Sequence, residues 1–221
     1  MPLHDWSKVP SGLYHHFRQC WAVNISKAIN HILPEDHSAL MEPSGGLYPS
    51  MDRGNLTEDQ IYAAKANRIA IKQRLSTTVA VIEIVSPGDK TDSAAVLKFV
   101  ERAVVFLRKG IHLLVIDPFP PGEWDPFGMH KVIWNRIGDG DFEFLPEQDR
   151  LFVAYCAGKE VAAYVDSLSV GQEVFEMPVF LTETGHVTVP LGSTYSETWN
   201  LCPAVFRKAV ETGELPKFDD E

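Results

Sequence analysis

Apolar residues recur along the chain with two different periods, which together predict alternating helices and strands. Spacings of three and four predict an amphipathic helix over residues 12–33 and a second that begins near Asp92 and ends at Gly110. Runs rich in β-branched residues predict two buried strands, over residues 79–85 and 111–116. The order strand, helix, strand predicts a right-handed crossover that joins two parallel strands.

Weaker patterns surround this unit. A helix is predicted over residues 125–136, with Asp125 as its cap and Pro126 in its first turn. Residues 53–67 are polar and predict a loop with a short helix, and residues 203–211 predict a last helix. Alternating or short apolar runs predict further strands, over residues 38–42, 68–75, 151–156, 161–165, 179–182 and 186–189.

The composition changes this picture little. A chain of 221 residues, 45% hydrophobic and 23% charged, fits one compact globular domain. The longest apolar run is far shorter than the ~20 residues that a membrane helix needs, so no membrane partner is expected. The start of the chain has no cationic and apolar segments of a secretory signal. Three widely spaced cysteines, an odd number, predict a reduced, cytoplasmic protein.

The charge is unevenly distributed. The net charge of −10 opposes binding to nucleic acid, because phosphate contacts need cations. Residues 139–221, however, hold 5 basic and 16 acidic residues, whereas residues 60–116 hold 9 basic and 4 acidic residues. A mildly basic centre beside an acidic C-terminal third is compatible with a phosphate ligand, and a solvated surface explains it more simply.

One charged residue interrupts the first buried strand. Glu83 lies within the β-branched run of residues 79–85, and a carboxylate buried there must pair, bind a cation or become neutral. One interpretation is that Glu83 binds a metal ion. The other is that it lies at a partly open edge and pairs with Lys72 or Arg74.

Specific segments also resemble a known family. The sequence VAVIEIVSPGDK over residues 79–90, followed by GIHLLVID over residues 110–117, resembles the Uma-type family of predicted endonucleases. The similarity is closer still to a related bacterial family of unknown function, and covers nearly the whole chain. The shared segments are MPLHDW at the start, HHF at 15–17, ALME at 39–42, FPPG at 119–122, PL at 190–191 and TY at 194–195.

The resemblance implies the PD-(D/E)-x-K fold: a restriction-endonuclease-like mixed sheet with flanking helices in residues 1–138. The acidic, β-rich residues 139–221 would extend the same sheet within a single domain. The chemistry expected of that fold is hydrolysis of phosphodiester bonds with Mg²⁺ or Mn²⁺, which take carboxylate ligands. Glu83 is then the main metal ligand, with Glu42 as a further candidate or, alternatively, a surface residue.

The family pattern is broken at two positions. Where related proteins carry Pro-Asp, this chain has Pro49-Ser50, so Asp52 becomes the second ligand only if its strand slips or bulges. Val85 occupies the position of the family's lysine. Lys90 is the best replacement cation, with Lys98 as an alternative, although a loop lysine is as frequently a surface residue.

Other residues complete the expected site. Ser86 orients a phosphate or a water, or else caps the turn before Pro87. Lys72, Arg74 and Lys98 are the candidates for contacts to nucleic acid. The leading hypothesis is a metal-dependent nuclease, with nucleic acid as partner and a homodimer as a further option. The alternative is a catalytically inactive relative that binds a partner through the same cleft.

Overall fold

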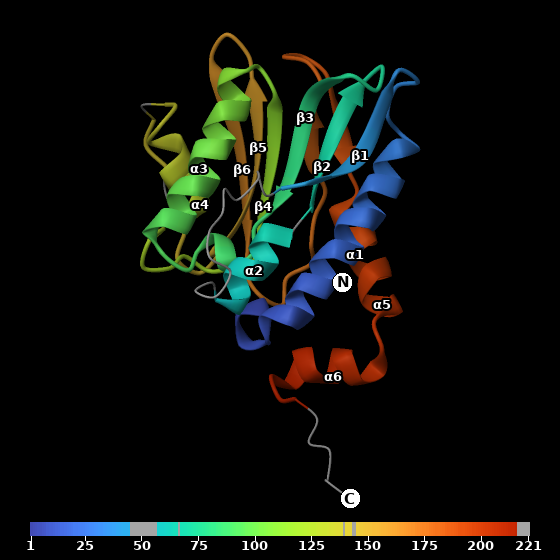
Figure 1. Cartoon of the computed structure of the whole chain (residues 1–221), viewed down its shortest axis with the longest axis vertical. Coiled ribbons are helices and arrows are strands. Elements are labelled where there is room, and N and C mark those ends of the chain that lie inside the picture. The colour runs from blue at the N-terminus through green and yellow to red at the C-terminus, as the bar shows by residue number, and fades with distance from the viewer. Residues whose placement is uncertain (45–56, 66, 139, 143–144, 216–221) are drawn as a thin grey trace, which may run out of the picture.

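The computed structural model describes residues 1–44, 57–65, 67–138, 140–142 and 145–215, and its centre is a six-stranded mixed sheet (Figure 1). In spatial order the strands are β1 (His37–Pro43), β2 (Asn67–Gln73), β3 (Thr77–Ile84), β4 (His112–Asp117), β5 (Arg150–Ala157) and β6 (Val161–Leu168). Strands β3 and β4 run parallel, and every other neighbouring pair is antiparallel. The α/β class with a mixed sheet is therefore confirmed.

Each face of the sheet is covered by a different layer (Figure 1). Helices α3 (Ser93–Arg108) and α4 (Gly128–Trp134) cover one face. Helix α1 (Ser11–Asn30), helix α5 (Leu191–Leu201) and the hairpin β7 (Met177–Phe180)–β8 (His186–Val189) cover the other. Because successive side chains of a strand alternate between faces, Val81 and Val85 pack toward α3 while Ile82 and Ile84 pack toward α1.

The predicted crossover is present. Helix α3 connects β3 to its parallel neighbour β4. The carboxylate of Asp92 caps the helix by accepting a hydrogen bond from the Ala95 amide at 2.8 Å. Gly110 follows the helix with φ +73°, a left-handed conformation that glycine adopts without strain. Local capping signals and the apolar stripe therefore agree with the tertiary structure here.

The C-terminal part differs from its prediction. Strands β5 and β6 extend the main sheet as expected, but β7 and β8 form a separate two-stranded sheet. Helix α5 was not predicted, because its Thr194, Ser196 and Thr198 are poor helix formers. Their hydroxyls donate to carbonyls one turn earlier, at 2.8, 2.8 and 2.7 Å. Packing against α1 compensates for this low propensity.

The remaining elements are short. They are the helices α2 (Glu58–Lys65) and α6 (Ala204–Thr212) and the 3₁₀ turns η1 (Trp6–Lys8) and η3 (Pro87–Asp89). The helix predicted over residues 125–136 is present as α4, but it starts at Gly128 rather than at Asp125, and no side chain caps its first turn. In the described part of the chain, no helix has both the length and the hydropathy of a membrane span.

Candidate functional site

Polar side chains gather where β3 and β4 end, at one edge of the sheet. Glu83 lies one residue before the end of β3, and η3 follows that strand directly. Asp117 is the last residue of β4. Because parallel strands present their carboxyl ends at the same edge, these groups come together there, as ligand-binding groups commonly do in α/β proteins.

Glu83 is buried beneath α3. Its side chain is 3% exposed, and it shares the sheet face of Val81 and Val85. The Nε atom of Arg102, on α3, donates to Oε1 of Glu83 at 3.1 Å. The carboxylate therefore has a helix arginine as its partner and does not lie at an open edge.

The second oxygen of Glu83 has an unusual environment. Oε2 is buried, and within the described residues it has no hydrogen-bond partner. Strand β2 pairs with β3 so that Ile69 lies opposite Ile82, and the preceding residue, Arg68, therefore lies opposite Glu83. The Nε atom of Arg68 is also buried and has no hydrogen-bond partner among the described residues. An acceptor and a donor without partners thus occupy one region of the sheet, which is costly unless another group or water bridges them.

Lys90 lies in a closed cluster beside Glu83. Its side chain is 8% exposed. Nζ donates to Asp117 Oδ2 and to the carbonyl oxygen of Pro120 at 2.9 Å each, and lies 2.8 Å from Asp125 Oδ2. Asp125 therefore pairs with Lys90 by charge, because its Oδ2 has no hydrogen-bond partner among the described residues. Lys90 is an internal residue rather than an exposed loop lysine.

The cluster contains one more carboxylate than cations. Burial raises the pKa of Asp117, the charge of Lys90 offsets this only in part, and Asp125 adds to the rise. Burial by itself would lower the pKa of Lys90, but the two aspartates outweigh it and hold that pKa above its usual value. Lys90 is therefore charged at neutral pH, and its proton is not available for transfer.

Ser86 and Asp89 form a local cap. The backbone amide and the hydroxyl of Ser86 both donate to Oδ2 of Asp89, at 2.9 and 2.6 Å. The other oxygen of Asp89 lies 3.9 Å from Nη2 of Arg102, which links this turn to Glu83. Of the two roles considered for Ser86, the structure displays the capping role.

The expected third carboxylate, Glu42, is paired on β1. Its two oxygens lie 2.7 Å from Lys72 Nζ and 3.3 Å from Arg68 Nη2. The hydrogen bond from Lys72 lowers the pKa of Glu42, and Arg68 contributes to the same effect. Glu42 shares the sheet face of Glu83, but Arg68 of the intervening strand lies between them.

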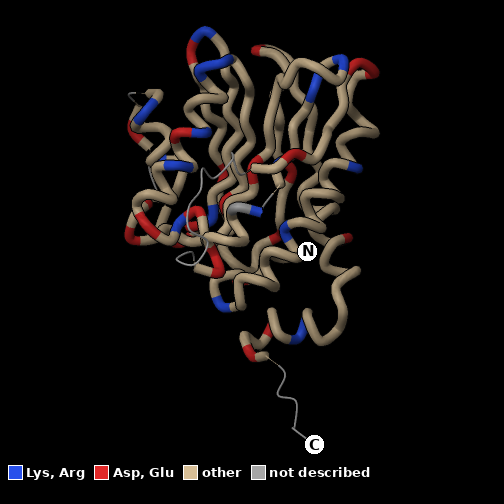
Figure 2. Tube along the Cα trace, in the orientation of Figure 1, with Lys and Arg blue, Asp and Glu red and all other residues tan. Residues whose placement is uncertain are grey.

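The candidate nucleic-acid contacts are dispersed. Lys72 pairs with Glu42, Arg74 lies in the β2–β3 turn at the opposite end of β3 from Glu83, and Lys98 is exposed on α3. Lys and Arg positions are interleaved with Asp and Glu positions along the chain (Figure 2). The described residues therefore do not bring these three cations onto one continuous strip.

The metal site can be assessed only in part, because Asp52 lies outside the described residues. Within the described ranges, no three His, Cys, Asp or Glu side chains are grouped as metal ligands. Glu83 offers one oxygen without a partner, but Arg102 binds the other and Arg68 is adjacent. The described residues by themselves do not fit a divalent cation, which requires several oxygen ligands.

Several site residues were missed by sequence reasoning. Arg102 is the partner of Glu83, and its only signal is a basic residue beside the apolar stripe of α3. Asp125 was interpreted as a helix cap but binds Lys90. From α1, the Tyr14 hydroxyl donates to the Val85 carbonyl at 2.7 Å and Arg18 Nε donates to the Ile84 carbonyl at 2.6 Å. These long-range contacts carry no local sequence pattern.

A hollow of about 440 Å³ adjoins the Lys90 cluster. Trp6, Phe119 and several prolines form its walls, and Lys90 and Asp59 are among its polar lining residues. Oδ1 of Asp59 is buried without a hydrogen-bond partner among the described residues. No protein family, curated protein or solved structure matches this chain.

Proposed function

We propose that this chain is a restriction-endonuclease-like protein that acts by binding rather than by hydrolysis. Its resemblance to the Uma-type endonucleases, the crossover β3–α3–β4 and the acidic residue in β3 support the architecture. One observation carries the functional part. Each described residue considered for catalysis or metal binding has an internal partner: Glu83 has Arg102, Lys90 has Asp117 and Asp125, and Glu42 has Lys72 and Arg68.

Those pairings oppose the chemistry of phosphodiester hydrolysis. A nuclease lysine must reach the attacking water or the phosphate, whereas three protein oxygens surround Lys90 Nζ. A metal-binding carboxylate must offer its charge to the cation, whereas an arginine holds Glu83. The hollow beside Lys90, with apolar walls, is where we expect the protein to bind its partner.

A second candidate function is a Mg²⁺- or Mn²⁺-dependent nuclease. The observation that favours it is the buried Oε2 of Glu83, which has no hydrogen-bond partner among the described residues. A cation shared with Asp52 would satisfy that oxygen. In that case Glu83 would be indispensable for hydrolysis, and Arg102 would compete with the metal.

Cleavage assays separate the two functions. Single- and double-stranded DNA and RNA would be incubated with the full chain and Mg²⁺ or Mn²⁺, beside two variants, Glu83→Gln and Glu101→Gln. Glu101 is an exposed residue of α3, so it controls for the loss of one carboxylate. We expect no metal-dependent cleavage by any of the three. Cleavage that is lost in Glu83→Gln and retained in Glu101→Gln would establish the nuclease instead.

A further inference from the structure

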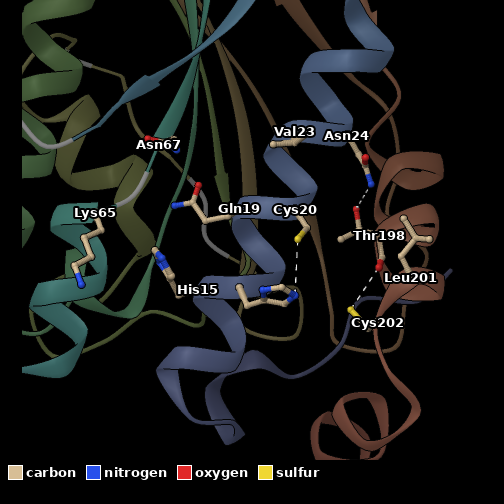
Figure 3. A pocket seen from close by; sticks show the side chains of 11 residues that line it. His15, Gln19, Cys20, Val23, Asn24, Lys65, Asn67, Thr198, Leu201 and Cys202 are labelled. Carbon is tan, nitrogen blue, oxygen red and sulfur yellow. Dashed lines mark hydrogen bonds between the residues drawn. The ribbon is translucent and has the colours of Figure 1, made fainter.

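A second cavity lies away from the Glu83 edge. It has a volume of about 490 Å³, within the range of small-molecule sites. It extends across the outward face of α1, from α2 and the start of β2 on one side to the end of α5 on the other (Figure 3). Its lining residues therefore come from segments far apart in the sequence.

The side of the cavity toward α2 offers hydrogen-bond donors. Figure 3 shows His15 and Gln19 of α1 facing Lys65 and Asn67. Nε2 of Gln19 is buried and, among the described residues, has no acceptor. A buried amide donor without an acceptor is costly, so this atom favours a ligand that brings an acceptor oxygen.

Lys65 is the one Lys or Arg among the described residues that line the cavity, and it lies on the same side. No carboxylate is among the described residues that line the cavity, although the chain has a net charge of −10. Burial lowers the pKa of His15, and the positive charges of Arg18, Lys65 and His16 lower it further. Glu58 of α2 is not among the residues that line the cavity and interacts with the Tyr62 hydroxyl. An anion bound here would pair with the charge of Lys65 and favour the protonated form of His15.

The other side of the cavity carries apolar side chains around one polar pair, in which Asn24 Nδ2 donates to Thr198 Oγ1 at 3.0 Å. Val23 and Leu201 line this side and are 44% and 74% exposed, and the thiol-bearing Cys20 and Cys202 lie between α1 and α5 (Figure 3). Exposed apolar side chains beside a polar pocket gain from contact with an apolar ligand group. The two sides therefore suit two ends of one amphipathic molecule.

We propose that this cavity binds a small amphipathic anion. Its carboxylate or phosphate head would accept hydrogen bonds from Gln19 and His15 near Lys65, and its short alkyl chain would lie along Val23 and Leu201. This site is independent of the Glu83 edge, and it stands whether or not that edge hydrolyses phosphodiesters.

Four probes test the proposal on the full chain: octanoate, octyl phosphate, 1-octanol and inorganic phosphate. Calorimetry would report affinity, and NMR would follow the titration of His15. We expect at least one of the two anions, octanoate or octyl phosphate, to bind and to raise the pKa of His15. The anion that binds with the higher affinity identifies the head group. We expect 1-octanol and inorganic phosphate to bind at least roughly tenfold more weakly, since each lacks one half of the ligand.

Variants locate the binding. Gln19→Glu places a negative charge at the proposed head-group position and should lower the affinity for the octyl anion by roughly tenfold or more. Lys65→Glu should lower this affinity as well. Lys159→Glu, at an exposed position beyond β5, should leave the affinity unchanged. Thermal unfolding would confirm that each variant folds. Failure of both octyl anions to bind, equal binding of 1-octanol, or full affinity in Gln19→Glu would overturn the proposal.

Discussion

The two charged clusters at the ends of β3 and β4 differ in how completely their charges are satisfied. In one, oxygens of Asp117, Asp125 and Pro120 surround Lys90 Nζ within 2.9 Å, although Asp125 Oδ2 pairs with it without a hydrogen bond. In the other, Glu83 uses one oxygen to bind Arg102 while its second oxygen is buried without a partner among the described residues. The first cluster surrounds its cation with oxygens, whereas in the second the cation contacts one oxygen of Glu83.

The difference also shows that the place of a residue in the sequence does not decide whether it reacts, because reactivity depends on its partners in space. Lys90 and Glu83 lie in the segments that the sequence indicated, yet Asp117, Asp125 and Arg102 engage their charges. Buried ion pairs of this kind are sensitive to loss of one partner, and this makes the comparison testable.

The largest effect is expected from Lys90→Met. Removing the ammonium leaves two carboxylates facing each other in a buried site, so the free energy of unfolding should fall by about 3–5 kcal/mol. Urea unfolding would measure it, with Lys159→Met, at an exposed position, as the control that should change by less than about 0.5 kcal/mol. A small effect at Lys90 would mean that the cluster is not closed.

A smaller effect is expected at the second cluster. Arg102→Met should lower the free energy of unfolding by about 2–3 kcal/mol. This is less than for Lys90→Met, because the side chain of Arg102 is 19% exposed. When Glu83→Gln is already present, Arg102→Met should lower the free energy of unfolding by about 1–2 kcal/mol less than it does in the wild type, because no buried charge is then left unpaired. Strictly additive effects in this double-mutant cycle would show that another cation, and not Arg102, neutralises Glu83.

Sequence and structure agree where local signals and tertiary contacts coincide. The apolar stripe of α3, its cap Asp92 and Gly110 define that helix without reference to the rest of the chain. Helix α5 was missed because Thr194 and Thr198 disfavour a helix locally, and its burial against α1 decides the outcome. Asp125 shows the opposite case, since a local capping signal yields to a long-range ion pair with Lys90.

The candidate site was only partly predictable for the same reason. Glu83 is marked by its place in an apolar run, because an acid there needs a partner. Which partner it has depends on the packing of α3 over β3, and nothing near Arg102 in the sequence indicates that contact. Asp52 lies outside the described residues and stays a prediction.

The smallest effect is expected when the stability of the protein is compared at neutral and acidic pH. Because burial holds the pKa of Asp117 above its ordinary value of 3.8, the folded state takes up a proton before the unfolded state as the pH falls. Ionised Asp117 therefore opposes folding near neutral pH, and this cost is relieved as the pH falls toward its folded-state pKa. The stability of the wild type relative to Asp117→Asn should accordingly increase on acidification, as measured by urea unfolding at several pH values.

Glu42 should behave in the opposite way. Its lowered pKa adds stability that is present above the ordinary value of 4.5 and is lost as the pH falls through its folded-state pKa. The wild type should therefore lose its advantage over Glu42→Gln on acidification, by a small amount because this carboxylate is partly exposed. If both variants responded with the same sign, the assigned pairings would be wrong.

The two candidate functions differ most in whether the Glu83 carboxylate is held by Arg102 or is available to a cation. Titration of the full chain with Mn²⁺, followed by electron paramagnetic resonance of the free ion, measures this directly when the wild type is compared with Glu83→Gln. We predict identical titrations, with no bound Mn²⁺ that depends on Glu83. A site that fills in the wild type and disappears in Glu83→Gln would contradict the account and restore the metal-dependent nuclease.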